Sequence, residues 1–190
     1  MREKDPKKLE AIFNATLKLV LREGFSSLKM GSVAREARIA TGTLYVYFDS
    51  KEALINQLYL ELKRQNASKY LEGYDFAAPF MITFERIWKN YLLAQLSQPE
   101  AAAFMEQYYR SPYLQESVKE ETDKLLKPIF DLLERGKAER LIKDLYTPLL
   151  VIQLSGAIGE FVRWHQSGQI EATNEIVNQA FKLAWDSIKQ

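Results

Sequence analysis

Residues 30–51, MGSVAREARIATGTLYVYFDSK, constrain the fold of this chain more than any other stretch. Two short segments in which apolar residues recur at helical spacing, residues 30–37 and 41–47, are separated by only Arg38, Ile39 and Ala40. Two helices joined by so short a turn form a helix-turn-helix, whose second helix lies in the major groove of DNA. The stretch therefore predicts a DNA-binding element that the other helices support.

The segment before this element predicts a helix over residues 6–23, with its apolar residues on one stripe. Asp5 is placed to accept hydrogen bonds from the first turn, where Pro6 needs no backbone donor. Gly24 predicts the end of the helix, because glycine readily adopts the left-handed backbone that terminates helices. The three helices within residues 1–50 are then the first, helix-turn-helix domain.

The segments after the element are helical as well. Residues 51–71 predict a longer fourth helix, capped by Asp49 or Ser50, that joins the first domain to a second domain over residues 51–190. No segment alternates apolar and polar residues as a strand does, so the fold class is all-α with about nine helices. The remaining helices are expected over residues 80–97, 99–110, 113–135, 148–166 and 173–188. Pro128 should kink or divide the helix over residues 113–135, and Thr147 should cap the helix over residues 148–166.

The composition of the 190-residue chain excludes several classes of protein. The absence of cysteine rules out a disulfide framework and thiol catalysis, and fits a reducing cytoplasm. Polar residues interrupt each apolar run near the N-terminus, so we expect neither a signal peptide nor association with a membrane. Residues 1–51 have a net charge of +4 and residues 52–190 a net charge of −3. The positive charge thus lies with the segment expected to meet DNA phosphates.

The sequence gives little support to a catalytic or metal site. His165 is the only histidine, and no pattern of serine and carboxylate residues identifies a triad around it. The acidic residues Glu120, Glu121 and Asp123 are spaced as a solvated helix face, and there is no glycine-rich phosphate loop. We therefore expect a protein that is not an enzyme and that holds no cofactor and no metal.

One set of residues recurs at the fixed spacings of a known protein family: Val33, Ala34, Leu44, Tyr45, Tyr47, Phe48, Ser50, Lys51 and Leu54. At these positions the chain resembles the TetR family of bacterial transcriptional regulators. The family pattern contains an Ile/Val-Ala pair, a Gly-Val-Ser-type turn and the run Gly-Thr-Leu-Tyr-x-Tyr/His-Phe-x-Ser/Asn-Lys-x-x-Leu. The resemblance covers roughly residues 6–60, and the rest of the chain matches the family in length and helical content.

Three positions depart from the family pattern. Arg38 stands where the turn usually has Gly, Ala40 where a Ser usually caps the recognition helix, and Leu28 where the second helix usually starts with Thr. A left-handed backbone at Arg38 costs on the order of 1 kcal/mol. Without a capping Ser, Thr41 is expected to take over the cap. These departures leave open an alternative function, a helical interaction protein of the same fold with lost or altered DNA binding.

The expected DNA contacts come from the second helix of the motif. Thr41 and Thr43 can reach base edges, Gly42 allows the backbone to approach, and Tyr45 can contact a thymine methyl or a sugar-phosphate. None of these is an Arg–guanine pair, so we expect specificity to be spread over several weak contacts and DNA shape.

Further residues are expected at the DNA backbone. Tyr47 and Lys51 resemble the phosphate clamps of the family. At the start of the second helix, Ser27 or Lys29 is expected to meet the backbone donors or a phosphate. The alternatives are a partly buried aromatic flank for Tyr45 and Tyr47, and a solvated charge for Lys51.

The resemblance implies a homodimeric repressor that binds a palindromic operator in double-stranded DNA and that a small-molecule effector releases. The last two predicted helices carry apolar stripes with small residues, which favours a four-helix dimer interface; the alternative is that these stripes close the core of the monomer. The interface residues predicted on this basis are Leu154, Ser155, Ile158, Val162, Val177, Ala180, Phe181 and Ala184.

The second domain is rich in aromatic residues, which is compatible with a small, apolar or aromatic effector. Aromatic residues at helical spacing also occur in ordinary cores, so both interpretations stay open for each of them. The candidate effector-binding residues are Phe84, Trp88, Tyr91, Phe104, Tyr108, Phe130 and Phe161.

Overall fold

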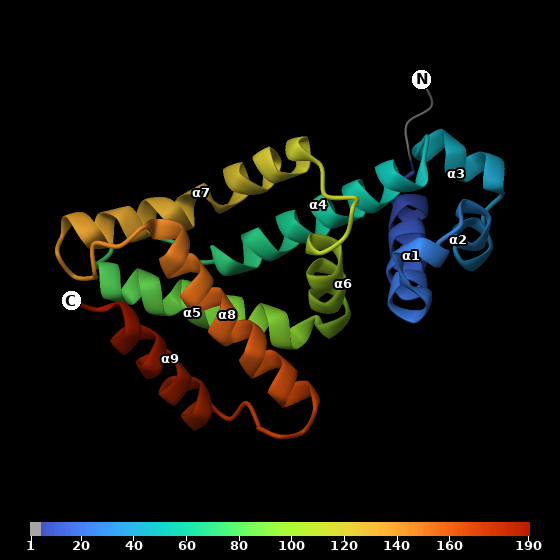
Figure 1. Cartoon of the computed structure of the whole chain (residues 1–190). Coiled ribbons are helices and arrows are strands. Elements are labelled where there is room, and N and C mark those ends of the chain that lie inside the picture. The colour runs from blue at the N-terminus through green and yellow to red at the C-terminus, as the bar shows by residue number, and fades with distance from the viewer. Residues whose placement is uncertain (1–4) are drawn as a thin grey trace. The chain divides into compact units, whose positions relative to one another are not determined.

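A computed structural model describes residues 5–190 as an all-α protein, as the sequence predicts. Over these residues the only β-type pairing is an isolated bridge between Ile142 and Lys189. None of the described helices is long and apolar enough to cross a membrane. The helices of the described chain (Figure 1) are α1 (Pro6–Ser27), α2 (Met30–Glu36), α3 (Thr41–Tyr47), α4 (Lys51–Tyr70), α5 (Phe80–Ser97), α6 (Pro99–Tyr109), α7 (Glu116–Ala138), α8 (Thr147–Gln166) and α9 (Asn174–Ile188).

Local capping sets several helix ends where the sequence places them. The Asp5 side chain accepts a hydrogen bond from the Lys7 amide at 3.0 Å and starts α1. Gly24 has the expected left-handed backbone, with a φ of 79°, but it interrupts α1 rather than ending it, because helical residues continue to Ser27. Of the two residues predicted to cap α4, Ser50 forms the bond, its hydroxyl accepting from the Ala53 amide at 3.0 Å.

One prediction about a helix boundary is wrong. Thr147 lies inside α8, and the capping position belongs to Tyr146, which makes no side-chain capping bond. The buried Thr147 hydroxyl instead donates to the Glu134 carboxylate and accepts from Lys137 Nζ at 2.6 Å, because the end of α7 packs against the start of α8. Of the two outcomes expected at Pro128, a kink or a division of the helix, the division does not occur, since α7 runs through Pro128 as one helix.

Contacts along the chain group the residues into two compact units, each described separately. The first extends to Arg64 and includes Glu100–Thr122, whereas the second comprises Gln65–Pro99 and Asp123–Gln190. The helix-turn-helix therefore shares its unit with most of α4, with α6 and with the start of α7. The division at residue 50 into functional domains stays a prediction.

The core of the first unit holds the short helices α2 and α3 in place. Val33 of α2 and Leu44 of α3 are fully buried, and they pack in one cluster with residues of α1, α4 and α6. Aromatic rings extend this cluster: Phe25, near the end of α1, lies 5.3 Å from the ring of Phe104 and 6.4 Å from that of Tyr108. Because α3 has only seven residues, this packing rather than helix propensity fixes its position.

The core of the second unit is built where α5 packs against α8 and α9 (Figure 1). The rings of Phe80 and Phe84 on α5 are stacked 5.7 Å apart, and Trp88 meets Phe181 of α9 edge-on at 5.6 Å. Gly136 of α7 lies against Phe80 so closely that a Cβ at this position would be 2.5 Å from the ring. Only glycine allows α7 and α5 to approach this closely.

Candidate functional site

The turn between α2 and α3 is built as a helix C-cap. The Arg38 amide donates to the Arg35 carbonyl at 3.1 Å, and the Ile39 amide donates to the Ala34 carbonyl at 2.9 Å. This pair of bonds is the Schellman motif, which requires a left-handed residue at the Arg38 position. Arg38 has a φ of 57°, so the expected left-handed backbone is present.

The outer face of α3 carries the residues expected to read DNA. Thr41 and Gly42 are exposed, Thr43 is half-buried, and Tyr45 keeps 50% of its surface in solvent. Thr41 does not cap the helix as expected, because Ala40 occupies the capping position and no side chain satisfies the first turn. The amides of this turn are thus left for water or another acceptor.

Sequence reasoning overlooked Val46, which is 67% exposed on α3 next to Tyr45. The residues expected on the exposed side of this helix are Thr41, Thr43, Tyr45 and Tyr47, and Val46 is not among them. An exposed apolar residue on a recognition helix can contact a thymine methyl group. Its position three residues after Thr43 is the signal that could have identified it.

The two predicted phosphate clamps already have partners within the first unit. Tyr47 is buried, and its hydroxyl accepts a hydrogen bond from the Asp5 amide at 2.9 Å, which holds the start of α1. Lys51 is half-buried; its ammonium donates to the Phe25 carbonyl at 3.4 Å and lies 5.4 Å from the centre of the Tyr113 ring. Lys51 is therefore positioned by the end of α1 and by Tyr113, in the segment between α6 and α7.

Exposed cations surround the turn and the start of α2. Lys29, Arg35 and Arg38 are exposed, and none of them forms an ion pair with another residue of the described range 5–190. Glu36, the carboxylate between the two arginines, is instead paired with Lys18 at 2.6 Å. The hydrogen bond from Lys18, followed by its charge, holds the pKa of the Glu36 carboxyl below its ordinary value. The surface next to α3 thus keeps unneutralised positive charge that suits an anionic partner.

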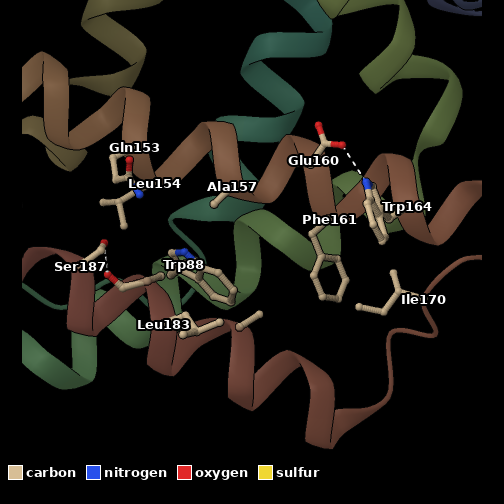
Figure 2. A pocket seen from close by; sticks show the side chains of 12 residues that line it. Trp88, Gln153, Leu154, Ala157, Glu160, Phe161, Trp164, Ile170, Leu183 and Ser187 are labelled. Carbon is tan, nitrogen blue, oxygen red and sulfur yellow. Dashed lines mark hydrogen bonds between the residues drawn. The ribbon is translucent and has the colours of Figure 1, made fainter.

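An apolar groove of about 390 Å³ opens between α8 and α9 in the second unit (Figure 2). Trp88 of α5 lies at its floor, and its indole nitrogen is buried without a hydrogen-bond partner in the described structure. At one end, Trp164 donates from its indole nitrogen to the Glu160 carboxylate at 2.8 Å. The other lining residues are Gln153, Leu154, Ala157, Phe161, Ile170, Ala180, Leu183, Ala184 and Ser187.

The structure shows where the predicted interface residues of α8 and α9 lie within a single chain. Five of the eight belong to the core of their own protomer, because the stripes they form face α5 and each other: Ile158, Val162, Val177, Phe181 and Ala184. Leu154, Ser155 and Ala180 are half-buried. The apolar side chains left in solvent are different ones: Leu149, Ile152, Trp164 and Leu183.

The candidate effector residues are distributed over both units. Phe104 and Tyr108 lie in the first unit, where the Tyr108 hydroxyl donates to Asn56 Oδ1 at 2.7 Å and its ring stacks on Tyr59 at 4.0 Å. Burial, followed by the nearby Tyr59, raises the pKa of Tyr108 to about 12. These two residues are core residues of the DNA-binding unit, because α6 packs there rather than with the remaining aromatics.

The other five candidates are in the second unit. Phe84 and Trp88 are buried in its core, and Tyr91, Phe130 and Phe161 are half-buried. The rings of Tyr91 and Tyr70 meet edge-on at 4.6 Å, and burial raises the pKa of the Tyr91 hydroxyl. Half-buried aromatic side chains keep exposed ring surface that a ligand can contact.

Over residues 5–190 no group of three or more histidine or acidic residues is arranged to hold a metal ion. His165 is half-buried near the end of α8, with Nδ1 3.1 Å from the Ile170 carbonyl oxygen. The ring therefore helps to hold the loop that follows α8.

Comparisons with known proteins agree on one family. The family described as "Bacterial regulatory proteins, tetR family" matches residues 12–58, and "Tetracyclin repressor-like, C-terminal domain" matches residues 79–189. An uncharacterized HTH-type transcriptional regulator from Haemophilus influenzae is 31% identical over 112 residues, which make up 59% of this chain and 60% of that protein. The chain thus matches less than two thirds of the length of this relative.

Solved structures share the fold over nearly the whole chain. A TetR family transcription regulator from Marinobacter aquaeolei VT8 is 26% identical and superimposes with a TM-score of 0.93, with 100% of both chains covered. The transcriptional regulator FadR from Bacillus subtilis, solved in complex with stearoyl-CoA, has a TM-score of 0.71 at 18% identity, over 92% of this chain and 96% of that one. The second likeness is one of fold alone.

Proposed function

Because this chain belongs to the tetR family of bacterial regulatory proteins, we propose that it is a ligand-responsive repressor that binds a palindromic operator as a homodimer. Its relatives are transcriptional regulators and not enzymes. The observation that carries the proposal is the exposed face of α3, with Thr41, Gly42 and Tyr45, next to cations that lack ion pairs. As a regulator of transcription it works on DNA in the cytoplasm.

Recognition of the operator is proposed to rest on several weak contacts. Thr41, Thr43 and Val46 offer hydroxyl and methyl groups to base edges, and Gly42 offers the backbone. Lys29, and Lys51 at the start of α4, are placed to meet phosphates. No single one of these contacts discriminates strongly, so DNA shape is expected to contribute.

A second copy of the chain is the proposed occupant of the exposed face of α8 and α9. Leu149, Ile152, Gly156 and Trp164 are exposed along α8, at spacings that place them on one side of the helix. A Cβ added to Gly156 would meet nothing within 4 Å, so another helix can approach closely there. Packing this face and Leu183 of α9 against the same face of a second copy buries apolar surface with two-fold symmetry. Such a dimer presents two recognition helices to successive turns of the operator.

The effector is proposed to be a small apolar or aromatic molecule bound by the second unit. Its half-buried Tyr91, Phe130 and Phe161 supply apolar surface, and a neighbour of the same fold, FadR, was solved with stearoyl-CoA. α4 has its start in the first unit and its end in the second, so a shift of this helix can carry the response to Lys51.

DNA binding is tested by fluorescence anisotropy with the DNA that flanks the protein's own gene. We expect binding that weakens with salt, because phosphate contacts release counterions. Lys51→Ala should lower the slope of log Kd against log salt by about one unit per protomer while sparing sequence preference. Lys182→Ala, at an exposed lysine of α9, is the matched control and should leave the slope unchanged.

Two results would contradict these assignments. An unchanged salt slope for Lys51→Ala, in a variant that keeps its helical circular dichroism, removes Lys51 from the phosphate contacts. Failure of the wild type to bind any promoter fragment at low salt favours the alternative function, an interaction protein of the same fold.

A further inference from the structure

Three helices of this protein end in the same hydrogen-bonded motif. After α7, the Arg140 amide donates to the Lys137 carbonyl at 2.9 Å and the Leu141 amide to the Gly136 carbonyl at 2.9 Å. After α8, the amides of Gly168 and Gln169 form the equivalent pair of bonds, each of 3.0 Å. The turn at Arg38 has the same pattern, so these three helix ends can be compared directly.

The residue at the centre of each motif has a left-handed backbone. Gly168 has a φ of 73°, which glycine adopts without penalty, whereas Arg38 and Arg140 each have a φ of 57°. A side chain at this position is strained by its Cβ, and such strain is often found at functional sites. Arg140 shows that the strain alone does not identify a function. The surroundings of the two arginines must therefore distinguish a functional residue from one that is only strained.

Arg38 differs from Arg140 in where it lies. Both arginines are exposed and held by the same pair of backbone hydrogen bonds, but only Arg38 lies in the turn that leads into α3, three residues before its exposed first residue, Thr41. Arg38 forms no ion pair or side-chain hydrogen bond within residues 5–190, since Glu36 is occupied by Lys18 and Arg38 is the weakest of the charges that act on Glu36. An unneutralised cation on a strained and hydrogen-bonded backbone thus stands at the edge of the recognition helix.

We propose that the Arg38 guanidinium binds the operator beside α3, at a position where the glycine usual in the family has no side chain. A guanidinium binds the phosphate oxygens or the guanine edge through two parallel hydrogen bonds. The Schellman motif fixes the backbone from which this side chain extends, so only the side chain has to be ordered when DNA binds. This inference rests on the proposed function, because it requires that α3 binds DNA.

Three variants of the full-length protein separate the side chain from the backbone. Arg38→Ala removes the guanidinium and keeps the left-handed strain, whereas Arg38→Gly removes both. Arg140→Gly relieves the same strain far along the chain and is the matched control. Each variant is titrated by fluorescence anisotropy against the DNA flanking its own gene and against a random duplex of equal length, over a series of salt concentrations.

We expect Arg38→Ala and Arg38→Gly to weaken binding to the flanking DNA about tenfold per protomer, or about a hundredfold for the dimer, as for loss of one charge-assisted hydrogen bond from each copy. The salt slope should fall by about one unit per protomer. Arg140→Gly should bind as the wild type does. The thermal midpoint should rise by about 1–4 °C in both glycine variants and not in Arg38→Ala. Equal losses on both duplexes assign the contact to phosphate, and a loss confined to the flanking DNA assigns it to a base edge.

Unchanged affinity and salt slope in Arg38→Ala would overturn the proposal. A loss seen in Arg38→Gly alone would also overturn it, because flexibility of the turn would then be the cause. Failure of the wild type to bind the flanking DNA refutes the proposed function as well, so this outcome is recognised before any variant is measured.

Discussion

Replacing Leu183 with glutamate should dissociate the dimer without unfolding the protomer. Leu183 is 72% exposed on α9 and lines the groove between α8 and α9. Its replacement should change the stability of the protomer little, because most of its surface already faces water. In the proposed dimer the same surface is covered by the second copy.

The magnitude follows from the exposed fraction. Burying a leucine completely is worth about 1.5–3 kcal/mol, so covering the 72% that remains exposed contributes about 1–2 kcal/mol per copy. A two-fold axis places the residue in the interface twice, which gives about 2–4 kcal/mol, or a rise in the dimer Kd of roughly 30- to 700-fold. A glutamate without a partner adds a desolvation cost to this loss.

Analytical ultracentrifugation over a concentration series measures the dimer Kd, and circular dichroism reports whether the helices persist. Leu93→Glu is the matched control, since Leu93 is also an exposed leucine, at 54%, but does not line the groove.

Phe181→Ala should act differently and lower the stability of the protomer by about 3–5 kcal/mol, because Phe181 is a core residue. A Leu183→Glu variant that stays dimeric at the wild-type Kd, or a wild type that is monomeric at micromolar concentration, would refute the assignment of this face.

Two predictions concern stability. Gly136→Ala should lower the free energy of unfolding by about 1–3 kcal/mol, since its Cβ would lie 2.5 Å from the Phe80 ring; a wild-type midpoint in urea would mean that the ring moves away at no cost. Tyr108→Phe should cost about 1–3 kcal/mol, because the buried Asn56 loses its 2.7 Å hydrogen bond. The pKa of Tyr108 is raised from its ordinary 10.0 to about 12, so the unfolded chain ionises first and stability should fall as the pH rises from 10 towards 12. Urea titrations at several alkaline pH values measure this fall, and an equal fall in Tyr108→Phe would show that another group causes it.

The sequence by itself determined the features that depend on neighbouring residues. The cap at Asp5 and the left-handed backbone at Gly24 follow from local chemistry, and the structure contains both, although α1 continues beyond Gly24 to Ser27. The helix-turn-helix and its family were also identified from the sequence, because many residue types recur there at fixed spacings.

The sequence did not determine which side of a helix is covered. α8 and α9 carry apolar residues on more than one side, so periodicity alone could not separate the core stripe with Ile158 and Phe181 from the exposed face with Ile152 and Leu183. Only the packing of α5 against both helices decided this, because burial depends on residues far away in the sequence.

The same reason explains two other results that only the tertiary structure supplied. The Tyr47 hydroxyl is bound by the backbone of Asp5, 42 residues earlier in the chain. Phe104 and Tyr108 pack with Phe25 and Tyr59 in the DNA-binding unit, although the sequence places α6 among the helices of the second domain. Local patterns define where helices begin and end, whereas the partners of each side chain are set by contacts that form only when distant segments meet.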